Sequence, residues 1–362
     1  MKTKKPATEI ALDAIIQKAL EGQLLSGEEV EAVLQLEEPQ LIEHLFNTAL
    51  QVRQQYFGDQ VFLYGFLYTS TYCRNHCRFC FYRIDNPLPS RYRYRKTTEQ
   101  ILASAQRLAE SGVHLIDLTL GEDPQNFNSD GPQFEPFIDL VKRVRAAVDL
   151  PIMVSPGVMP GVVLEQLSQA GAQWYACYQE THNPTLFRQL RPNQDYDIRL
   201  NTKLQARNCG MLTEEGILVG VGETAQDIAH SFKVMRSMGL SQVRAMNFVP
   251  QAGTPMSHLT PPHPFRELKI IALLRLMFPH CLIPATLDVE GLSGLKQRLK
   301  AGANVVTSIV PPGLGLAGVA QNSLDIEDAR RTTEHVRQII NQCGLQEASL
   351  GQYLGYIQKE NS

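Results

Sequence analysis

The chain has 362 residues, of which 43% are hydrophobic, and a formal net charge of −3. This charge argues against broad binding to nucleic acids or anionic membranes, and the length suits one α/β barrel. No apolar run approaches the roughly 20 residues of a membrane helix, and no apolar signal segment follows the basic N-terminus. Four of the cysteines stand singly in the sequence, at Cys177, Cys209, Cys281 and Cys343. This cysteine usage is typical of reduced thiols in the cytoplasm.

Residues 1–58 are expected to form a helical extension without obvious chemistry. Apolar residues recur there at helical spacing, and Ser26 before two glutamates is typical of a helix start. From residue 59 to 362, short apolar runs alternate with amphipathic segments. Strands are expected at 61–68, 113–120, 151–154, 172–178, 216–221, 242–248, 282–287 and 303–309. Helices are expected at 97–112, 134–148, 162–170, 196–208, 225–238, 264–278, 289–300 and 324–343. Eight successive β/α units predict a (β/α)8 TIM-type barrel.

Three cysteines follow the first expected strand, at Cys73, Cys77 and Cys80, with Phe79 just before the third. Thiolates spaced C-x3-C-x2-C repel one another unless a soft metal lies between them. Each iron of a four-iron cluster usually has its own cysteine, so three cysteines leave one iron open to a small cofactor. The alternatives are a zinc site with His76 as fourth ligand, or a chance cluster of buried thiols.

Charged and hydroxyl residues lie in or at the ends of other expected strands, where barrel enzymes place their chemistry. These residues are Asp117, Ser155, Arg244, Thr286 and Asp288. A carboxylate inside an apolar strand needs a partner. One arginine and two acids complement an amino acid with one carboxylate and two ammonium groups. The alternatives are an internal Arg–Asp network that only fills the barrel and, for Ser155, a simple turn.

The loop after the fourth strand carries Glu180 and Arg191, and Arg199 follows on the next helix. A carboxylate there can accept ribose hydroxyls, and an arginine can bind a carboxylate through two hydrogen bonds. The alternative is a surface ion pair between Glu180 and Arg199. The glycine-rich turn at 220–224 lacks the lysine of a nucleotide P-loop, so we expect it to pack against an adenine. The basic run at 91–96 is expected to be extended, with its arginines pointing outward.

The cysteine spacing with Phe79 resembles the radical S-adenosylmethionine (SAM) superfamily. Together with the stretches 178–183, 220–224 and 249–255, it resembles the group of biotin synthase, thiamine tyrosine lyase and hydrogenase maturase. Over residues 61–320, the chain most closely resembles the methylornithine synthase family. Biotin synthase carries a further cysteine near the position of Glu214. Its absence argues against a second cluster and against sulfur insertion.

The resemblance implies specific roles for the residues named above. The [4Fe–4S] cluster would be held by Cys73, Cys77 and Cys80. SAM would be bound by Phe79, near its adenine, and by Ser155, Glu180, Arg191 and Arg199. The amino acid substrate would be bound by Asp117, Arg244, Thr286 and Asp288. The resemblance implies no side chain as a general acid or base.

The resemblance also implies an activity. It is the conversion of L-lysine to (3R)-3-methyl-D-ornithine, the first step of pyrrolysine biosynthesis. A 5′-deoxyadenosyl radical starts the reaction, in which the Cα–Cβ bond breaks and the fragments recombine. The enzyme would need an electron donor such as flavodoxin or ferredoxin. The alternatives are an enzyme of the hydrogenase-maturase type with another small amino-acid-like substrate, and a protein that only carries electrons or is stabilised by zinc.

Overall fold

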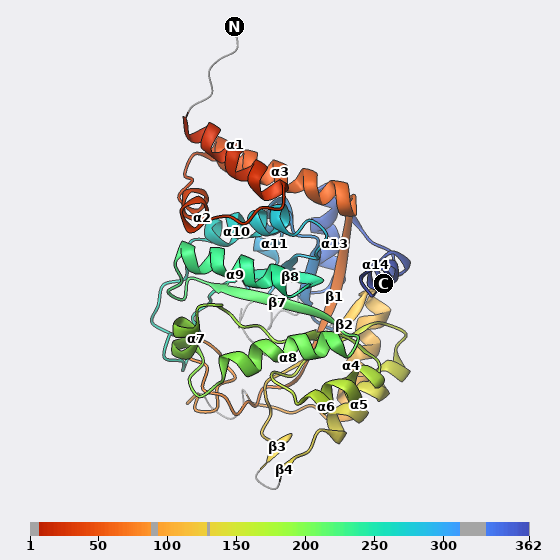
Figure 1. The fold of residues 1–362 in the computed structure, drawn as a ribbon. Helices are drawn as coiled ribbons and strands as arrows, with labels where there is room; N and C mark the ends of the chain where they lie inside the picture. The colour runs from red at the N-terminus through yellow and green to blue at the C-terminus, as the bar shows by residue number, and fades with distance from the viewer. Residues whose placement is uncertain (1–6, 88–92, 129–130, 312–330, 362) are drawn as a thin grey trace.

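Eight parallel strands surround the centre of the molecule in the computed structural model (Figure 1), which describes residues 7–87, 93–128, 131–311 and 331–361. The strands are β1 (Gln60–Ser70), β2 (Leu115–Leu120), β5 (Ile152–Ser155), β6 (Ala172–Ala176), β7 (Leu212–Val219), β8 (Gln242–Asn247), β9 (Pro284–Thr286) and β10 (Val305–Ile309). Their order is β8-β7-β6-β5-β2-β1-β10-β9. The amide of Val243 in β8 donates to the Leu282 carbonyl just before β9 at 3.0 Å, which joins the two ends of this order. The prediction of a (β/α)8 barrel is confirmed.

Helices cover the outside of the strands (Figure 1). They are α4 (Thr98–Ser111), α5 (Glu135–Ala147), α6 (Gly161–Gln169), α7 (Pro184–Leu190), α8 (Tyr196–Asn208), α9 (Ala225–Ser237), α10 (Pro264–Met277), α11 (Gly291–Lys300) and α13 (Thr333–Gln342). Local sequence explains several starts: Thr97 caps α4 and Thr224 caps α9, each through a capping box. The short helix α7 was not predicted. Of the last expected helix, residues 324–330 lie outside the described residues.

Strand β7 begins at Leu212, four residues before the expected start at Gly216. The prediction was wrong because Glu214 and Glu215 interrupt the apolar pattern. Both glutamates are nevertheless fully buried in the strand. Each forms an ion pair with a buried cation, which offsets the cost of removing its charge from water. The error matters because Glu214 proves to be part of the site described below.

A C-terminal segment that was not predicted covers the end of the barrel at which the strands begin. Strand β11 (Gln346–Glu347) pairs in parallel with the start of β1, and α14 (Leu350–Glu360) follows it. The Tyr353 hydroxyl donates to the Tyr64 hydroxyl at 2.7 Å. The Tyr356 hydroxyl donates to the Ser241 carbonyl, also at 2.7 Å, just before β8. The helix α14 therefore covers the end of the barrel opposite the strand ends where chemistry is expected. A small hairpin, β3 (Phe127–Asn128) and β4 (Gly131–Pro132), lies between β2 and α5.

The N-terminal helices α1 (Ala7–Leu20), α2 (Gly27–Leu34) and α3 (Pro39–Phe57) pack across the barrel helices α9 and α10 (Figure 1). The expected start at Ser26 is a capping box with Glu29. Lys269 on α10 donates to the Leu34 carbonyl at the end of α2, at 2.8 Å. One continuous apolar cluster includes residues of the extension and of the barrel. The division of the chain after residue 58 therefore stays a prediction.

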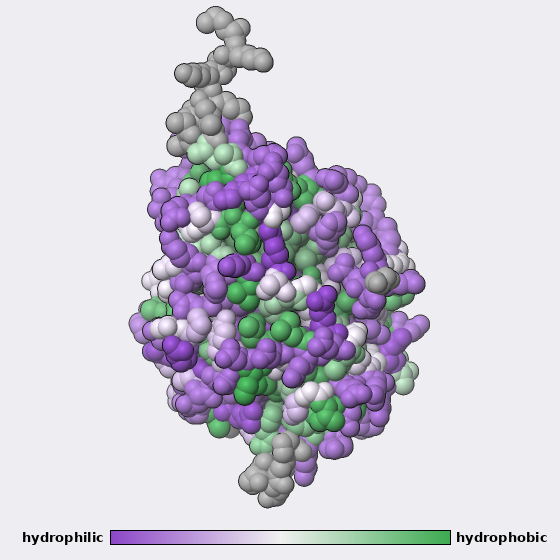
Figure 2. Space-filling model, viewed as in Figure 1, coloured by the Kyte–Doolittle hydropathy of each residue, from purple (hydrophilic) through white to green (hydrophobic). Residues whose placement is uncertain are grey.

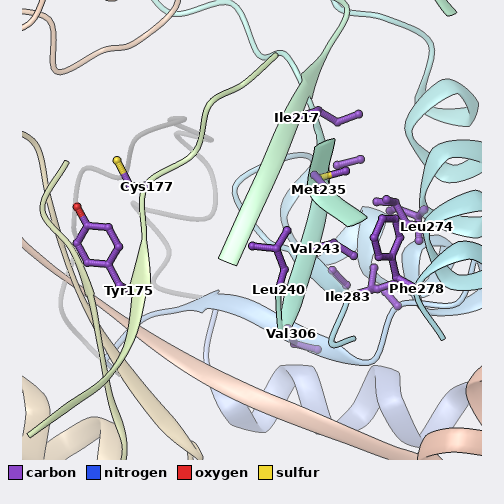
Figure 3. Packing of buried hydrophobic residues seen from close by; sticks show 14 of the residues in the cluster. Tyr175, Cys177, Ile217, Met235, Leu240, Val243, Leu274, Phe278, Ile283 and Val306 are labelled. Atoms are coloured by element: carbon purple, nitrogen blue, oxygen red, sulfur yellow. The ribbon is translucent and has the colours of Figure 1, made fainter. Parts of the chain in front are cut away.

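The apolar core lies between the strands and the surrounding helices. Val243, Leu274, Phe278 and Ile283 are part of it, where β8 and the start of β9 face α10 (Figure 3). The molecular face in Figure 2 is mostly hydrophilic, with hydrophobic side chains in small groups. Among the described residues, no helix has the length and apolar character needed to cross a membrane.

A buried ion pair between α10 and α11 yields a test of this packing. Glu267 accepts two hydrogen bonds from Arg298, at 2.9 and 2.8 Å, and both side chains are 1% exposed. Arg298→Met leaves the carboxylate buried without its cation, and should lower the free energy of unfolding by about 3–5 kcal/mol. Urea unfolding measures this change. The double variant Arg298→Met/Glu267→Leu should regain part of the loss, and a single variant as stable as the parent would contradict the assignment.

Candidate active site

The cysteine loop lies at the C-terminal end of the barrel, where Cys73, Cys77 and Cys80 line one wall of a cavity. The loop is held against the end of β2, because the Arg74 amide donates to the Glu122 carbonyl at 2.9 Å. A Cβ atom on Gly121 would lie 2.7 Å from the Cβ of Cys73. Glycine at this position is therefore required for the loop to approach the strand so closely.

Arg93 fixes both ends of the cysteine loop. Its guanidinium donates to the carbonyls of Thr71, before the first cysteine, and of Tyr82 and Arg83, after the third. The expectation that the arginines of this basic run point outward is wrong for Arg93, because its guanidinium is directed at these carbonyls of the cysteine loop. Arg91, in the same run, lies outside the described residues.

The three cysteines have surroundings that fit an iron–sulfur cluster. Arg191 Nη1 and Gln194 Nε2 lie 3.2 and 3.1 Å from the Cys77 sulfur, and N–H groups directed at sulfur tune such clusters. Burial raises the pKa of the Cys73 thiol to about 11, and burial with the neighbouring thiols raises the pKa of the Cys80 thiol further. Several thiolates at this place therefore need a cationic partner.

The zinc alternative finds less support in the geometry. The His76 side chain is 40% exposed and lies 3.5 Å from Asp85, whereas the three cysteines face the cavity. In the described part of the chain, no group of three His, Cys, Asp or Glu side chains is arranged around a single metal ion. The fit to a cluster rests on the cysteine spacing, the burial of the loop and the donors near Cys77.

All five residues predicted to bind SAM line the same cavity, at Phe79, Ser155, Glu180, Arg191 and Arg199. Arg191 Nη2 donates to Glu180 Oε1 at 2.6 Å, and its guanidinium carbon lies 5.1 Å from the Phe79 ring centre. Arg199 Nε donates to the Tyr178 carbonyl at 2.8 Å. The alternative of a surface ion pair between Glu180 and Arg199 is wrong, because Glu180 pairs with Arg191 and both arginines are buried.

Glu180 has a left-handed backbone, with φ of 68°. A residue other than glycine adopts this conformation at an energetic cost, and such residues gather at functional sites. The buried pair of Glu215 and Lys203 holds the segment that contains Glu180. Glu215 accepts from the Gln179 amide at 2.7 Å and pairs with Lys203 at 2.9 Å. Although burial alone would raise the pKa of Glu215, Lys203 and His182 lower it to about 2.

Asp117 lies inside the barrel on β2 and is fully buried. The Ser155 hydroxyl donates to its two carboxylate oxygens, at 2.8 and 3.1 Å. Burial, together with the charge of Glu214, raises the pKa of Asp117 to about 7, although Ser155, Thr119 and Arg244 act to lower it. In this structure Ser155 therefore acts on Asp117, and its predicted contact with SAM stays a prediction.

Arg244 on β8 is 4% exposed and lines the cavity. Its Nε donates to Glu214 Oε1 at 2.6 Å, and the Tyr178 hydroxyl donates to Glu214 Oε2 at 2.7 Å. The Tyr178 ring centre lies 5.1 Å from the guanidinium carbon. Arg244 Nη2 is buried and has no hydrogen-bond partner among the described residues. A buried guanidinium nitrogen without a partner marks a place for an anionic group.

Asp288 follows β9 and is held by side chains from other strands. Arg331 Nη1 donates to Oδ1 at 2.7 Å, the Tyr68 hydroxyl to Oδ1 at 3.1 Å, and the Ser308 hydroxyl to Oδ2 at 2.6 Å. Ser308 also has a left-handed backbone, with φ of 66°. Thr286 accepts from the Asp288 amide at 3.2 Å. Thr286 therefore supports Asp288, while Asp288 itself lines the cavity.

The charges around this part of the cavity differ from the expected set. The sequence predicted one cation and two anions, at Arg244, Asp117 and Asp288. The structure adds the anion Glu214, paired with Arg244, and the cation Arg331, paired with Asp288. Glu214 and Arg331 have opposite charges, so these additions leave the balance of the expected set unchanged. An amino acid with one carboxylate and two ammonium groups therefore still complements the site.

Sequence reasoning missed several residues that complete the site, namely Tyr68, Tyr178, Gln194, Glu214, Ser308 and Arg331. For Glu214 a signal existed, because two adjacent glutamates stand within the run from Met211 to Val219. The argument applied to Asp117, that a carboxylate in an apolar strand needs a partner, applies equally to Glu214. No such signal exists for the hydroxyl groups and Arg331, because only the fold brings them to the acids that they contact. The Tyr178 hydroxyl reaches Glu214, and Tyr68, Ser308 and Arg331 reach Asp288.

Comparisons with known proteins agree with this geometry. Residues 67–235 match the model of the radical SAM superfamily. The chain is 42% identical to 3-methylornithine synthase of Methanosarcina acetivorans, over 97% of this chain and 98% of the relative. The corresponding protein of Methanosarcina barkeri is 41% identical, over 93% and 94%. The chain belongs to the 3-methylornithine synthase family.

Structural comparison agrees with this membership. The crystal structure of a methylornithine synthase superimposes with a TM-score of 0.88 and 40% identity, over 94% of this chain and 99% of that one. The [FeFe] hydrogenase maturase subunit HydE of Thermotoga maritima is less similar, at 30% identity over 80% of this chain and 82% of HydE. The family is one of radical SAM enzymes, whose cofactors are a [4Fe–4S] cluster and SAM.

The cavity offers a matched pair of cysteines to test the cluster assignment. Cys77 belongs to the motif, whereas Cys177 lines the same cavity as a single buried thiol. After anaerobic reconstitution, the parent protein and Cys177→Ala should each bind about four irons per chain. Cys77→Ala should lose most of the iron and most of the visible absorbance of the iron–sulfur cluster. Equal iron content in the two variants, or a stoichiometric zinc ion in the parent, would contradict the assignment.

Proposed function

We propose that this protein is the lysine mutase that converts L-lysine to (3R)-3-methyl-D-ornithine, the first step of pyrrolysine biosynthesis. Membership of the family supports this function. The observation that carries it is the arrangement of charges that line the cavity beside the cysteine loop, with Arg244 available to a carboxylate and Asp117 and Asp288 available to ammonium groups. Lysine has one carboxylate and two ammonium groups, so each of its charges can meet an opposite charge.

The charged groups suggest one orientation for lysine. Arg244 Nη2, which has no hydrogen-bond partner among the described residues, would bind the substrate carboxylate. Asp288, supported by Thr286, would bind the α-ammonium group. Asp117 forms hydrogen bonds with a serine hydroxyl rather than an arginine, so it would bind the ammonium group at the far end of the side chain. Each charge of lysine then meets an opposite charge.

The cysteine loop and the SAM-binding residues would hold the two cofactors at one side of the same cavity. When bound, the reduced cluster and SAM supply a 5′-deoxyadenosyl radical that takes a hydrogen atom from the lysine side chain. The rearrangement breaks the bond between Cα and Cβ and joins Cα to Cγ, so that Cβ becomes the methyl branch. The product is an isomer of lysine, and the hydrogen atom returns to it.

The residues of the chain have to keep two substrate fragments together while the bond is broken. Arg244 and Asp288 would anchor the fragment with the carboxylate and the α-ammonium group, and Asp117 would anchor the amino-alkene fragment. Because the anchors lie on separate strands of one barrel, their relative positions are fixed by the sheet. Burial of the site also excludes water from the reactive carbons.

We further propose that a small one-electron carrier of the flavodoxin or ferredoxin kind reduces the cluster, and that the protein acts in the cytoplasm. SAM cleavage consumes an electron that no residue of the chain supplies in a catalytic cycle. The seven cysteines are all free thiols in the structure, and a reducing compartment keeps both thiols and cluster intact.

The function is tested by an anaerobic reaction with L-lysine, SAM and dithionite. We expect a product with the mass of lysine that separates from it in chromatography and co-elutes with synthetic 3-methylornithine. SAM with lysine omitted serves as the control and should give only slow formation of 5′-deoxyadenosine. Cleavage of SAM without any isomer of lysine would contradict the function and favour another amino-acid-like substrate.

The pKa of Asp117 predicts how turnover depends on pH. Because burial raises this pKa to about 7, the carboxyl is protonated below that pH and cannot pair with an ammonium group. At saturating SAM, kcat/KM for lysine should fall up to about tenfold per unit as pH decreases below 7, and level off above it. Initial rates of product formation between pH 5.5 and 8.5 measure this profile.

A second variant tests whether Asp117 is the group that titrates. Ser155→Ala removes two hydrogen bonds that lower the pKa of Asp117. The acid limb of the profile should therefore move to higher pH. Asp117→Asn should lose most of its activity, and the residual activity should not change through this range. A flat profile in the parent protein between pH 6 and 8 would contradict the role of Asp117.

A further inference from the structure

We propose that Glu214 and Tyr178 form a positioning pair that fixes the Arg244 guanidinium for binding the substrate carboxylate. Nothing in the family resemblance assigned a role to either side chain. The proposal rests on the proposed function, because it assumes that an amino acid is the ligand of Arg244. Neither residue is proposed to take part in the chemistry.

The hydrogen bonds give Glu214 one defined orientation. Its Oε1 accepts from Arg244 Nε at 2.6 Å, and its Oε2 accepts from the Tyr178 hydroxyl at 2.7 Å. Glu214 is fully buried on β7, next to Arg244 on β8, and Glu214 and Gly216 face residues Gln242 and Arg244 in the strand register. Both carboxylate oxygens therefore have a partner, and the side chain has no second orientation of comparable energy.

The same contacts limit the movement of Arg244. Nε is bound to Glu214, and one face of the guanidinium lies over the Tyr178 ring at 5.1 Å. Arg244 Nη2 is buried and has no hydrogen-bond partner among the described residues. A Cβ atom on Gly216 would approach Arg244 Cγ at 3.1 Å and the Tyr178 ring at 3.3 Å. Glycine at this position leaves the space in which the arginine and the tyrosine stack.

Arg244 interacts electrostatically with Asp117 and with Asp288 as well as with Glu214. The hydrogen bond to Glu214 therefore keeps Nε in one position among these three acids and leaves Nη2 for the substrate carboxylate.

The test compares Glu214→Leu, which has no acceptor, with Glu214→Gln, which keeps an acceptor oxygen without the charge. We expect Glu214→Leu to raise the KM for lysine at least about tenfold, with more SAM consumed per product formed. Glu214→Gln should stay within about threefold of the parent KM, because its amide oxygen still accepts from Arg244 Nε. Tyr178→Phe, which keeps the ring and loses the hydroxyl, should lie between the two. Iron content and thermal unfolding confirm that each variant is folded and loaded.

A lysine analogue without the carboxylate separates positioning from general damage. Cadaverine, 1,5-diaminopentane, has the two ammonium-bearing ends and cannot use Arg244. As a competitor of lysine it should inhibit the parent and Glu214→Leu equally, because its binding does not use Arg244, whereas much weaker inhibition of Glu214→Leu would indicate general damage and overturn the positioning role. In an Arg244→Met background, replacing Glu214 by Leu should change the KM for lysine by less than about twofold, because the group it positions is already absent.

The outcomes distinguish this proposal from the proposed function. If the parent protein makes no isomer of lysine, the proposed function fails, and the positioning role fails with it because it assumes lysine as the ligand of Arg244. If the parent turns lysine over and Glu214→Leu has a normal KM, the positioning role alone is overturned. Equal KM increases in Glu214→Leu and Glu214→Gln would also overturn it, because charge rather than orientation would then explain the effect. Additive effects of Glu214→Leu and Arg244→Met would do the same.

Discussion

The arrangement of side chains at the C-terminal end of this barrel depends on the cost of burying ionised groups. Several strands there contribute a charge that has lost most of its water, and such a charge persists only with a partner. Glu214 stabilises Arg244, and Arg331 with two hydroxyls stabilises Asp288. Asp117 accepts from a hydroxyl and has no ion pair within the described part of the chain, and burial raises its pKa. Among the residues that the structure describes, Arg244 and Asp288 therefore have counter-charges, whereas Asp117 lacks one at the place where a ligand ammonium group is expected.

The cysteine loop depends on the same constraint in another form. Thiols that are buried close together resist ionisation, and a metal cluster is what makes three thiolates acceptable there. The loop has no regular structure of its own, so its shape comes from contacts with other segments. Arg93 holds its two ends, Gly121 lets it lie against β2, and Arg191 and Gln194 reach Cys77 from the segment after β6. Segments far apart in sequence thus position the cofactor beside the substrate residues.

The fold could be predicted from the sequence to a large extent, because the alternation of apolar and amphipathic runs reflects burial directly. The barrel was predicted strand by strand, and the errors have a physical reason. The start of β7 was missed because Glu214 and Glu215 are charged although buried. Helix α14 was not predicted to cover the barrel, because this role depends on two tyrosines that contact distant strands. No pattern in the neighbouring sequence indicates those contacts.

The sequence by itself determined the kind of chemistry, because three cysteines and an aromatic residue at fixed spacing limit the metal centre before any folding is considered. It also indicated most of the charged residues that line the cavity, since charges in apolar strands need partners. Only the tertiary structure decided which charges pair with each other. Pairing depends on which strands are neighbours in the closed sheet, and β7 beside β8 places Glu214 next to Arg244. The sequence indicated Asp117 and Arg244, but only this arrangement shows that Glu214 binds Arg244 Nε and leaves Nη2 for a ligand.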